Sequence, residues 1–284
     1  MHAMDLFVFI AVLAAAACHA GWNTLLKLNV EPMVATSLVA AASGLVALPL
    51  AVYAGVPSLA AWPYVVASVV IHIAYYVALA EAYRTGDLGQ VYPIARGSAP
   101  LLTAVLAALW LAETPTTSGW AGIVVLAGGI VLLAARGGRA RKAFNARAVG
   151  FALLTSLTIT TYTLVDGIGA RLSGSALQYT AWLFLLSGCT MALYGFATIG
   201  QRLGREFAAN WPLTLGGAVL STAAYGLAIW AMTVAPIALV AALRETSVLF
   251  ATLLGTVLLR EPLMAARIAA AGLVLSGVLL VRLG

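Results

Sequence analysis

Charged residues are scarce in this sequence. Asp, Glu, Lys and Arg make up only 8% of its 284 residues, whereas hydrophobic residues make up 63%. A soluble domain usually carries about 25% charged residues, and the mean hydropathy here reaches +1.04. Too few polar side chains are present to cover a water-facing surface of this size. The composition therefore excludes a soluble globular protein and predicts an integral membrane protein whose surroundings are a lipid bilayer.

Cysteine and catalytic motifs are scarce or missing as well. The two cysteines, Cys18 and Cys189, lie in apolar segments without CxxC spacing, so they predict neither a disulfide framework nor a zinc site. The sequence contains no Walker loop, HExxH, GxSxG or metal-ligand cluster. We therefore expect no cofactor and no ATP-driven pump on this chain. His19 and His72 leave an intramembrane hydrolase as a minor alternative.

Long apolar runs fill most of the chain, and each is long enough to span a bilayer as a helix of about 20 residues. A closed barrel would need strands that alternate every second residue, and these runs do not alternate. The expected fold class is an all-α integral membrane protein with ten transmembrane helices. Their expected ranges are 5–26, 33–54, 61–82, 88–111, 117–136, 148–170, 176–199, 210–233, 236–259 and 264–282.

The basic residues fall on one side of these helices. The loops after the odd-numbered helices hold eleven of the fifteen, namely Lys27, Arg84, Arg136, Arg139, Arg141, Lys142, Arg147, Arg202, Arg205, Arg260 and Arg267. The other side holds only Arg171 and Arg282. Because basic loops remain in the cytoplasm, we expect the loop 136–147 inside and both termini outside. The net charge of +6 is thus explained by topology, without a nucleic-acid partner.

The sequence also repeats itself at an offset of 148 or 149 residues. The matches between rarer residues are Arg96 with Arg244, Glu113 with Glu261, Trp62-Pro63 with Trp211-Pro212, and Tyr76 with Tyr225. We therefore expect residues 1–140 and 141–284 to form two five-helix repeats. An odd number of helices in each repeat makes the two halves inverted. Inverted repeats are typical of alternating-access transporters, whose site lies near the midplane.

The repeated segments carry a resemblance to a known family. They read YVALAEAYRTGDLGQVYPIARGSAPLLTAVLAALWLAETPTTSGWAGIVVLAGG over 76–129 and YGLAIWAMTVAPIALVAALRETSVLFATLLGTVLLREPLMAARIAAAGLVLSG over 225–277. Both resemble the repeat of the EamA-type members of the drug/metabolite transporter superfamily, which open on Tyr, end a Leu-rich run in Glu and close on a Gly-bearing helix. The resemblance extends over essentially the whole chain.

This resemblance implies a function and a location. Similar ten-helix bacterial proteins of the inner membrane export aromatic and other neutral amino acids. The resemblance implies a non-enzymatic secondary transporter, active as a single chain, whose first, third, fourth, sixth, eighth and ninth helices surround a cavity for a small-molecule substrate. The alternatives are a carrier of drugs or other metabolites from the same superfamily and, from a different class, a passive channel.

Charged residues inside the expected helices are the first candidates for the site. Arg244 and Glu245 lie about 12 Å into the helix 236–259, at about 1.5 Å per residue. A charge at a helix centre costs about 2.5–3.5 kcal/mol, so such residues normally face a partner or a wet cavity. We expect Arg244 or Arg96 to meet a substrate carboxylate, and Glu245 to meet an amine or a proton. A structural ion-pair network is the alternative. The inverted halves also suggest that Arg96 and Arg244 each close the cavity on their own side.

Aromatic and polar side chains within the helices complete the candidate set. Rings with polar tips suit an amphipathic ligand, whereas packing and interfacial anchoring are the other common roles of such residues. The remaining candidate substrate-binding residues are His19, Trp22 and Asn23 in the first helix, Tyr75 and Tyr76 in the third, Tyr92 in the fourth, Tyr162 in the sixth, Trp182 in the seventh, Tyr225 in the eighth, and Ser247 in the ninth.

Overall fold

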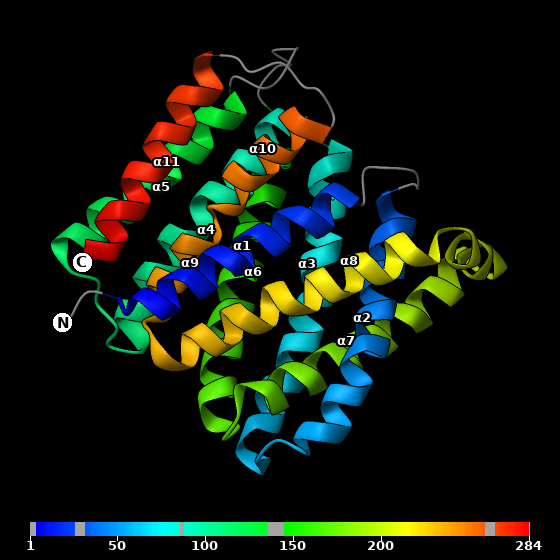
Figure 1. Cartoon of the computed structure of the whole chain (residues 1–284). Helices are drawn as coiled ribbons and strands as arrows, with labels where there is room; N and C mark the ends of the chain where they lie inside the picture. The colour runs from blue at the N-terminus through cyan, green and yellow to red at the C-terminus, as the bar shows by residue number, and fades with distance from the viewer. Residues whose placement is uncertain (1–3, 26–31, 86–87, 136–144, 259–264, 284) are drawn as a thin grey trace.

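The structure is a computed structural model that describes residues 4–25, 32–85, 88–135, 145–258 and 265–283. These residues form only helices (Figure 1). The elements are α1 (Leu6–Leu25), α2 (Pro32–Ala54), the short 3₁₀ helix η1 (Leu59–Ala61), α3 (Trp62–Thr85), α4 (Leu88–Trp110), α5 (Thr117–Ala135), α6 (Ala146–Leu172), α7 (Ala176–Ile199), α8 (Gln201–Val234), α9 (Ile237–Arg244), α10 (Ser247–Leu258) and α11 (Ala265–Leu283).

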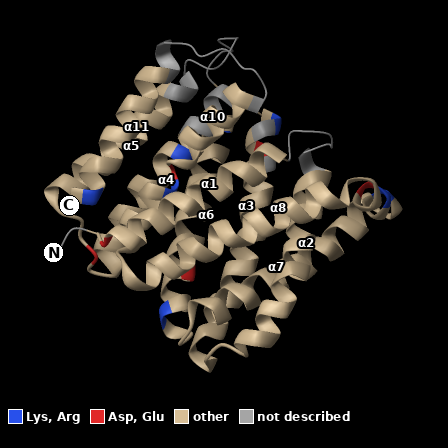
Figure 2. Cartoon of the chain, viewed as in Figure 1, with Lys and Arg blue, Asp and Glu red and all other residues tan. Residues whose placement is uncertain are grey.

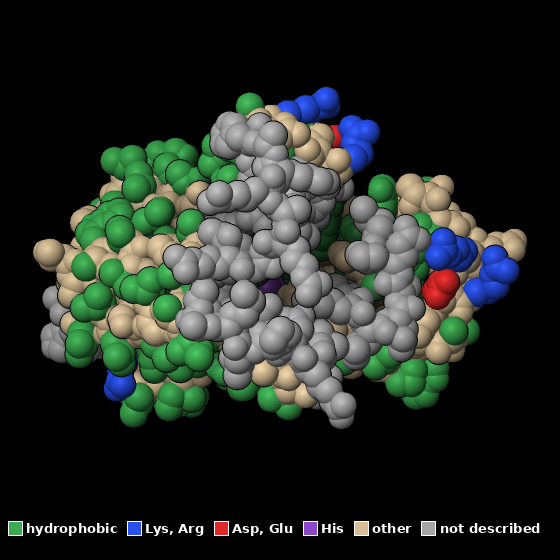
Figure 3. Space-filling view, turned by 90° about the horizontal axis from the view of Figure 1, so that it is seen from above, with side chains coloured by type: hydrophobic (Ala, Val, Ile, Leu, Met, Phe, Trp, Pro, Cys, Tyr) green, Lys and Arg blue, Asp and Glu red, His purple; other side chains and the backbone are tan. Residues whose placement is uncertain are grey.

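The ten expected membrane helices are confirmed as apolar helices. Seven spans in the described residues are long and apolar enough to cross a bilayer, and three shorter apolar helices cover Ile94–Trp110, Thr117–Leu132 and Ile268–Leu283. Charged side chains are few and lie mostly near helix ends (Figure 2). Seen from the end at the top of Figure 1, hydrophobic side chains cover the sides, and Lys and Arg gather in patches on the rim (Figure 3).

Two expected helices differ from the prediction. The helix expected over 210–233 begins earlier, because α8 runs from Gln201 with a kink at Asn210, whose φ of −126° is not helical. The helix expected over 236–259 is broken into α9 and α10. At this break, Glu245 and Thr246 donate their backbone N–H groups to the carbonyls of Ala242 and Leu243, in the tight pattern that ends a helix.

The helices pack in a pattern that matches two inverted halves. Helix α1 lies against α8 and α3 lies against α6, while α2 pairs with α7 and α5 with α11. If the two halves are exchanged, the α1–α8 pair takes the place of the α3–α6 pair. The α2–α7 and α5–α11 pairs each join equivalent helices of the two halves. The start of α6 is fixed to the end of α3 by Asn145, whose side chain caps α6 and donates to the carbonyl of Thr85 at 2.5 Å.

Small residues allow the closest helix contacts, as expected for a membrane bundle. On α5, a Cβ added to Gly122 would lie 2.6 Å from the backbone nitrogen of Val281 on α11. On α11, a Cβ on Gly277 would lie 2.7 Å from the backbone nitrogen of Leu126. The fifth and last helices therefore pack closely, and the two form a pair at one edge of the bundle (Figure 1).

The turns at the end of the molecule that holds both termini are tied together. Glu113, after α4, accepts a hydrogen bond from Arg171 of α6 at 2.5 Å and another from the backbone nitrogen of Ile237, the first residue of α9, at 2.8 Å. Arg171 also donates to the carbonyls of Met232 and Ala235. We call these groups the turn cluster. It joins α4, α6, α8 and α9 at one end of the bundle.

Candidate functional site

The break between α9 and α10 places two charged side chains inside the bundle. Arg244 is the last residue of α9, and Glu245 lies between the two helices. A cation is stabilised at the C-terminus of a helix and an anion at the N-terminus. The break therefore suits the order Arg-Glu in the sequence. Broken helices at membrane depth are tolerated where they line a cavity, and there they supply binding groups.

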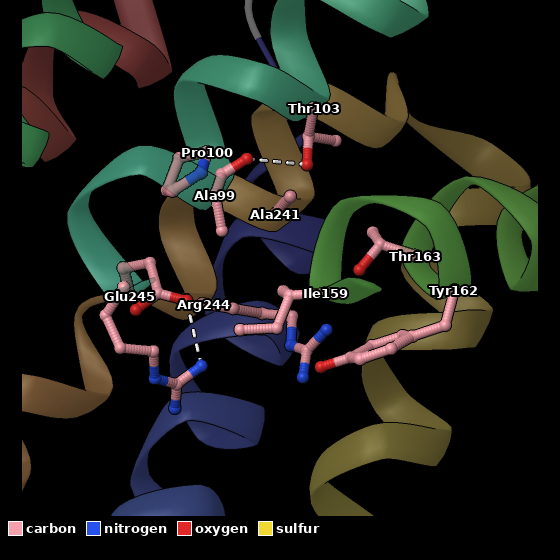
Figure 4. Close-up of a pocket in the computed structure, with 10 residues that line it drawn as sticks. Ala99, Pro100, Thr103, Ile159, Tyr162, Thr163, Ala241, Arg244 and Glu245 are labelled. Carbon is pink, nitrogen blue, oxygen red and sulfur yellow. Dashed lines mark hydrogen bonds and ion pairs between the residues drawn. The ribbon is translucent and has the colours of Figure 1, made fainter. Parts of the chain in front are cut away.

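A pocket lies beside this break, between α4, α6 and α9 (Figure 4). It encloses about 270 Å³ of empty space, part of which opens to the outside. Its lining residues are Arg96, Ala99, Pro100 and Thr103 of α4, Ile159, Tyr162 and Thr163 of α6, and Ala241, Arg244 and Glu245. The pocket thus brings together four of the sequence-predicted residues, namely Arg96, Tyr162, Arg244 and Glu245.

Arg96 and Glu245 form an ion pair across the pocket. The Nη1 atom of Arg96 lies 3.2 Å from Oε1 of Glu245, which is only 5% exposed. The Nη2 atom of Arg96 lies 2.7 Å from Nε2 of His19 on α1. The second carboxylate oxygen of Glu245, Oε2, is buried and has no hydrogen-bond partner among the described residues. Buried polar groups are almost always hydrogen-bonded. This unpaired acceptor therefore indicates a place where a ligand could supply the donor.

Arg244 is held by aromatic rings rather than by a carboxylate. Its guanidinium lies 4.8 Å from the centre of the Tyr225 ring, in a cation–π contact. Figure 4 shows the guanidinium and the Tyr162 side chain pointing toward one another. In the part of the chain that the structure describes, no Asp or Glu forms an ion pair with Arg244. The two arginines were expected on opposite sides of the cavity, whereas the structure places both in one pocket.

An aromatic cluster extends from the pocket toward α3. The rings of Tyr75 and Tyr225 approach that of Tyr162 edge-on, at 5.9 and 6.0 Å between centroids. Tyr76 contacts Tyr75 at 5.2 Å, so the two predicted tyrosines of α3 reach the pocket through Tyr162 and do not line it directly. His72 stacks on Tyr162 at 4.3 Å.

The predicted residues of α1 surround His19. Trp22 donates its indole N–H to Nδ1 of His19 at 3.3 Å, and the amide of Asn23 donates to the His19 carbonyl at 2.8 Å. His19 therefore connects α1 to Arg96. Because the Asn23 amide N–H donates to the backbone of its own helix, it is less available to bind a substrate.

Three further candidates lie elsewhere. The indole of Trp182 donates to the carbonyl of Gly55 and its ring packs on Trp62, near the turn before η1, so Trp182 does not line this pocket. Ser247 is buried at the start of α10, next to the break. Tyr92 lies in α4, but its side chain is outside the part of the chain that the structure describes.

Sequence reasoning undervalued Asp166. This carboxylate of α6 is completely buried and accepts hydrogen bonds from the hydroxyl groups of Tyr179, at 2.8 Å, and Tyr225. We call Asp166, Tyr179 and Tyr225 the carboxylate cluster. Its signal in the sequence was an acidic residue within an apolar span, which is rare and usually functional.

Comparisons with known proteins agree with this architecture. A sequence profile described as the EamA-like transporter family matches the chain twice, over residues 4–135 and 146–283. No curated protein matches the chain significantly. Among solved structures, one described only as a crystal structure of a protein superposes with a TM-score of 0.75 at 18% sequence identity, and the match covers 96% of this chain and 94% of the other. The likeness confirms the fold, and the double profile match confirms the two-repeat architecture.

Proposed function

The chain belongs to the EamA-like transporter family, within the drug/metabolite transporter superfamily, and we propose that it exports small zwitterionic metabolites, foremost neutral and aromatic amino acids, by alternating access. The family makes it a membrane transporter. The substrate class is inferred from the chemistry of the pocket. The inverted halves support a mechanism in which a central site opens alternately to the two sides of the membrane.

One observation carries the proposal: the pocket offers one free group of each sign. The Arg244 guanidinium has no carboxylate partner among the described residues, and Oε2 of Glu245 has no donor. A guanidinium binds a carboxylate with two parallel hydrogen bonds, and a buried carboxylate oxygen accepts from an ammonium group. An α-amino acid carries both complementary groups at adjacent positions, so one ligand would satisfy Arg244 and Glu245 together.

The remaining walls of the pocket support an amphipathic ligand of modest size. The ring of Tyr162 and the side chains of Ile159 and Ala99 offer apolar surface beside the two charged groups. The paired charges of Arg244 and Glu245 favour a zwitterion such as a neutral amino acid over a drug, which was the alternative within the superfamily.

We further propose that the protein works as a monomer in the bacterial inner membrane, with both termini outside. The eleven basic residues on the opposite side support this orientation. Of these, Arg84, Arg147, Arg202 and Arg205 have described side chains, and Lys27, Arg136, Arg139, Arg141, Lys142, Arg260 and Arg267 lie outside them.

The test is flux of labelled phenylalanine, threonine and methionine into proteoliposomes. We expect saturable exchange by the intact protein, and a loss of at least about tenfold in Arg244→Ala, because one charge-assisted bidentate contact contributes about 1.5–3 kcal/mol. Tyr76→Ala should have a smaller effect, since Tyr76 does not line the pocket. The exposed Arg205→Ala, at the start of α8, is the matched control and should retain full flux.

Competition experiments sharpen the same test. Phenylalanine should compete strongly, whereas phenethylamine and phenylpropionate, which each lack one charged group, should compete weakly. No flux above that of empty liposomes for any of the amino acids would overturn the substrate assignment. Equal inhibition by all three compounds would exclude the paired role of Arg244 and Glu245.

A further inference from the structure

The carboxylate of Asp166 lies inside the membrane, in the interior of the bundle. Its exposed fraction is 0%, and among the described residues no Lys or Arg forms an ion pair with it. Its hydrogen-bond donors are the hydroxyl groups of Tyr179 on α7 and Tyr225 on α8. A carboxylate charge at this depth is costly. The residue is therefore suited to exist in two protonation states.

Asp166 lies outside the pocket but on the same face of α6. It follows Tyr162 by four residues and Thr163 by three, so all three share one side of the helix. Asp166 precedes the end of α6 at Leu172 by six residues, or about 9 Å. It therefore lies between the pocket and the end of the molecule that carries the turn cluster.

Tyr225 connects this carboxylate to the pocket. Its hydroxyl group donates to Asp166, while the face of its ring lies 4.8 Å from the guanidinium of Arg244. The other groups near Asp166 are Ser68 and His72 of α3, and His72 is stacked on Tyr162. A change at Asp166 thus reaches Tyr225 by direct contact and Tyr162 through the His72 ring.

We propose that Asp166 is the proton-binding site that couples export to the inward movement of protons, an inference that rests on the proposed function. When ionised, Asp166 accepts both tyrosine hydrogens. When one proton joins the carboxylate, the protonated oxygen becomes a donor and a weaker acceptor, so the hydrogen bond from the tyrosine that faces it weakens. A weaker bond at Tyr225 holds its ring less firmly against Arg244, and the substrate carboxylate bound there is released.

The cycle balances as an exchange. Asp166 takes up one proton from outside as one zwitterion leaves, and it releases that proton inside as the next zwitterion binds. Because the zwitterion has no net charge, each cycle moves one positive charge inward. A pH gradient and a membrane potential should therefore both drive export. A gradient of about one pH unit corresponds to a tenfold accumulation at one proton per substrate.

The experiment compares two modes of transport of labelled phenylalanine in the same proteoliposomes. Exchange at equal pH reports binding and alternation. Accumulation in liposomes whose lumen is about one pH unit more acidic, with the potential clamped at zero, reports coupling. We expect Asp166→Asn to retain exchange but to lose the roughly tenfold accumulation. His72→Gln, which removes the neighbouring titratable ring and keeps the carboxylate, should keep this accumulation.

The outcomes separate this inference from the proposed function. Loss of exchange in the intact protein would overturn the substrate assignment. Full accumulation in Asp166→Asn, or its loss in His72→Gln alone, would overturn the role of Asp166. If Asp166→Asn also loses exchange, Asp166→Glu must restore both modes. A pH dye trapped in the lumen gives an independent measurement, since phenylalanine entry must make the lumen more alkaline. An unchanged lumen pH would refute the coupling.

Discussion

At the scale of single residues, Arg96 and Glu245 depend on one another. Their ion pair at 3.2 Å lies in the interior, and Arg96 also contacts His19. Removing one member of a buried pair costs about 3–5 kcal/mol, because the remaining charge is left uncompensated, whereas removing both can be nearly neutral. The pair thus anchors α4 to the break between α9 and α10.

A double-mutant cycle tests this dependence. We expect Arg96→Met and Glu245→Gln each to lower the melting temperature in detergent, with Arg96→Met the more severe because it leaves a buried carboxylate. The double variant should melt nearer to the intact protein than Arg96→Met does. Additive losses, measured by the same melts, would show that the two side chains act separately.

The sequence identified many of the pocket residues from their type, but it could not predict which side chains contact one another. Arg96, Arg244 and Glu245 were identified because charges in an apolar helix are costly, and the structure gathers them in one pocket. Trp182 does not line the pocket, since a tryptophan suits a helix end as well as a ligand site. Sequence spacing could not show that the Tyr225 hydroxyl meets Asp166, because these residues come from different helices.

At the scale of helices, glycine spacing decides which pairs pack closely. Gly122 of α5 meets the backbone of α11, whereas a Cβ on Gly128 of the same helix would have nothing within 4 Å. We expect Gly122→Ala to destabilise the fold by about 1–3 kcal/mol, as overpacking does, and Gly128→Ala to have no such cost. Melting temperatures and expression levels of the two variants measure the difference. Equal effects would contradict the close α5–α11 contact.

The break within the ninth span could not be read from the sequence. Most helix boundaries followed from apolar length, but no proline or glycine marks residues 242–246. The break forms because short-range hydrogen bonds end α9, and the Thr246 hydroxyl accompanies them by donating to the Leu243 carbonyl at 2.7 Å. Likewise, the sequence did not predict the helical segment 201–209, which the kink at Asn210 separates from the apolar span that follows.

At the scale of the whole molecule, the proposed orientation can be tested by labelling. Leu59 in η1 is 86% exposed, and Arg205 in α8 is exposed at the opposite end of the seventh span. We expect Leu59→Cys to react with a membrane-impermeant maleimide on intact cells, and Arg205→Cys to react only after lysis. The protein's own Cys18 and Cys189 lie within spans, and a variant with both replaced by Ala is the control. The reverse pattern of labelling would place the termini inside.

The short helix α9 has a consequence for the way the molecule moves. One end begins at Ile237, which is bound by Glu113 of the turn cluster, and the other end carries Arg244. Its eight residues extend for about 12 Å, and most are fully buried. We expect so short and buried a helix to move as one rigid unit. A movement of Arg244 in the interior should therefore displace Ile237 and its contact with Glu113 at the end of the bundle.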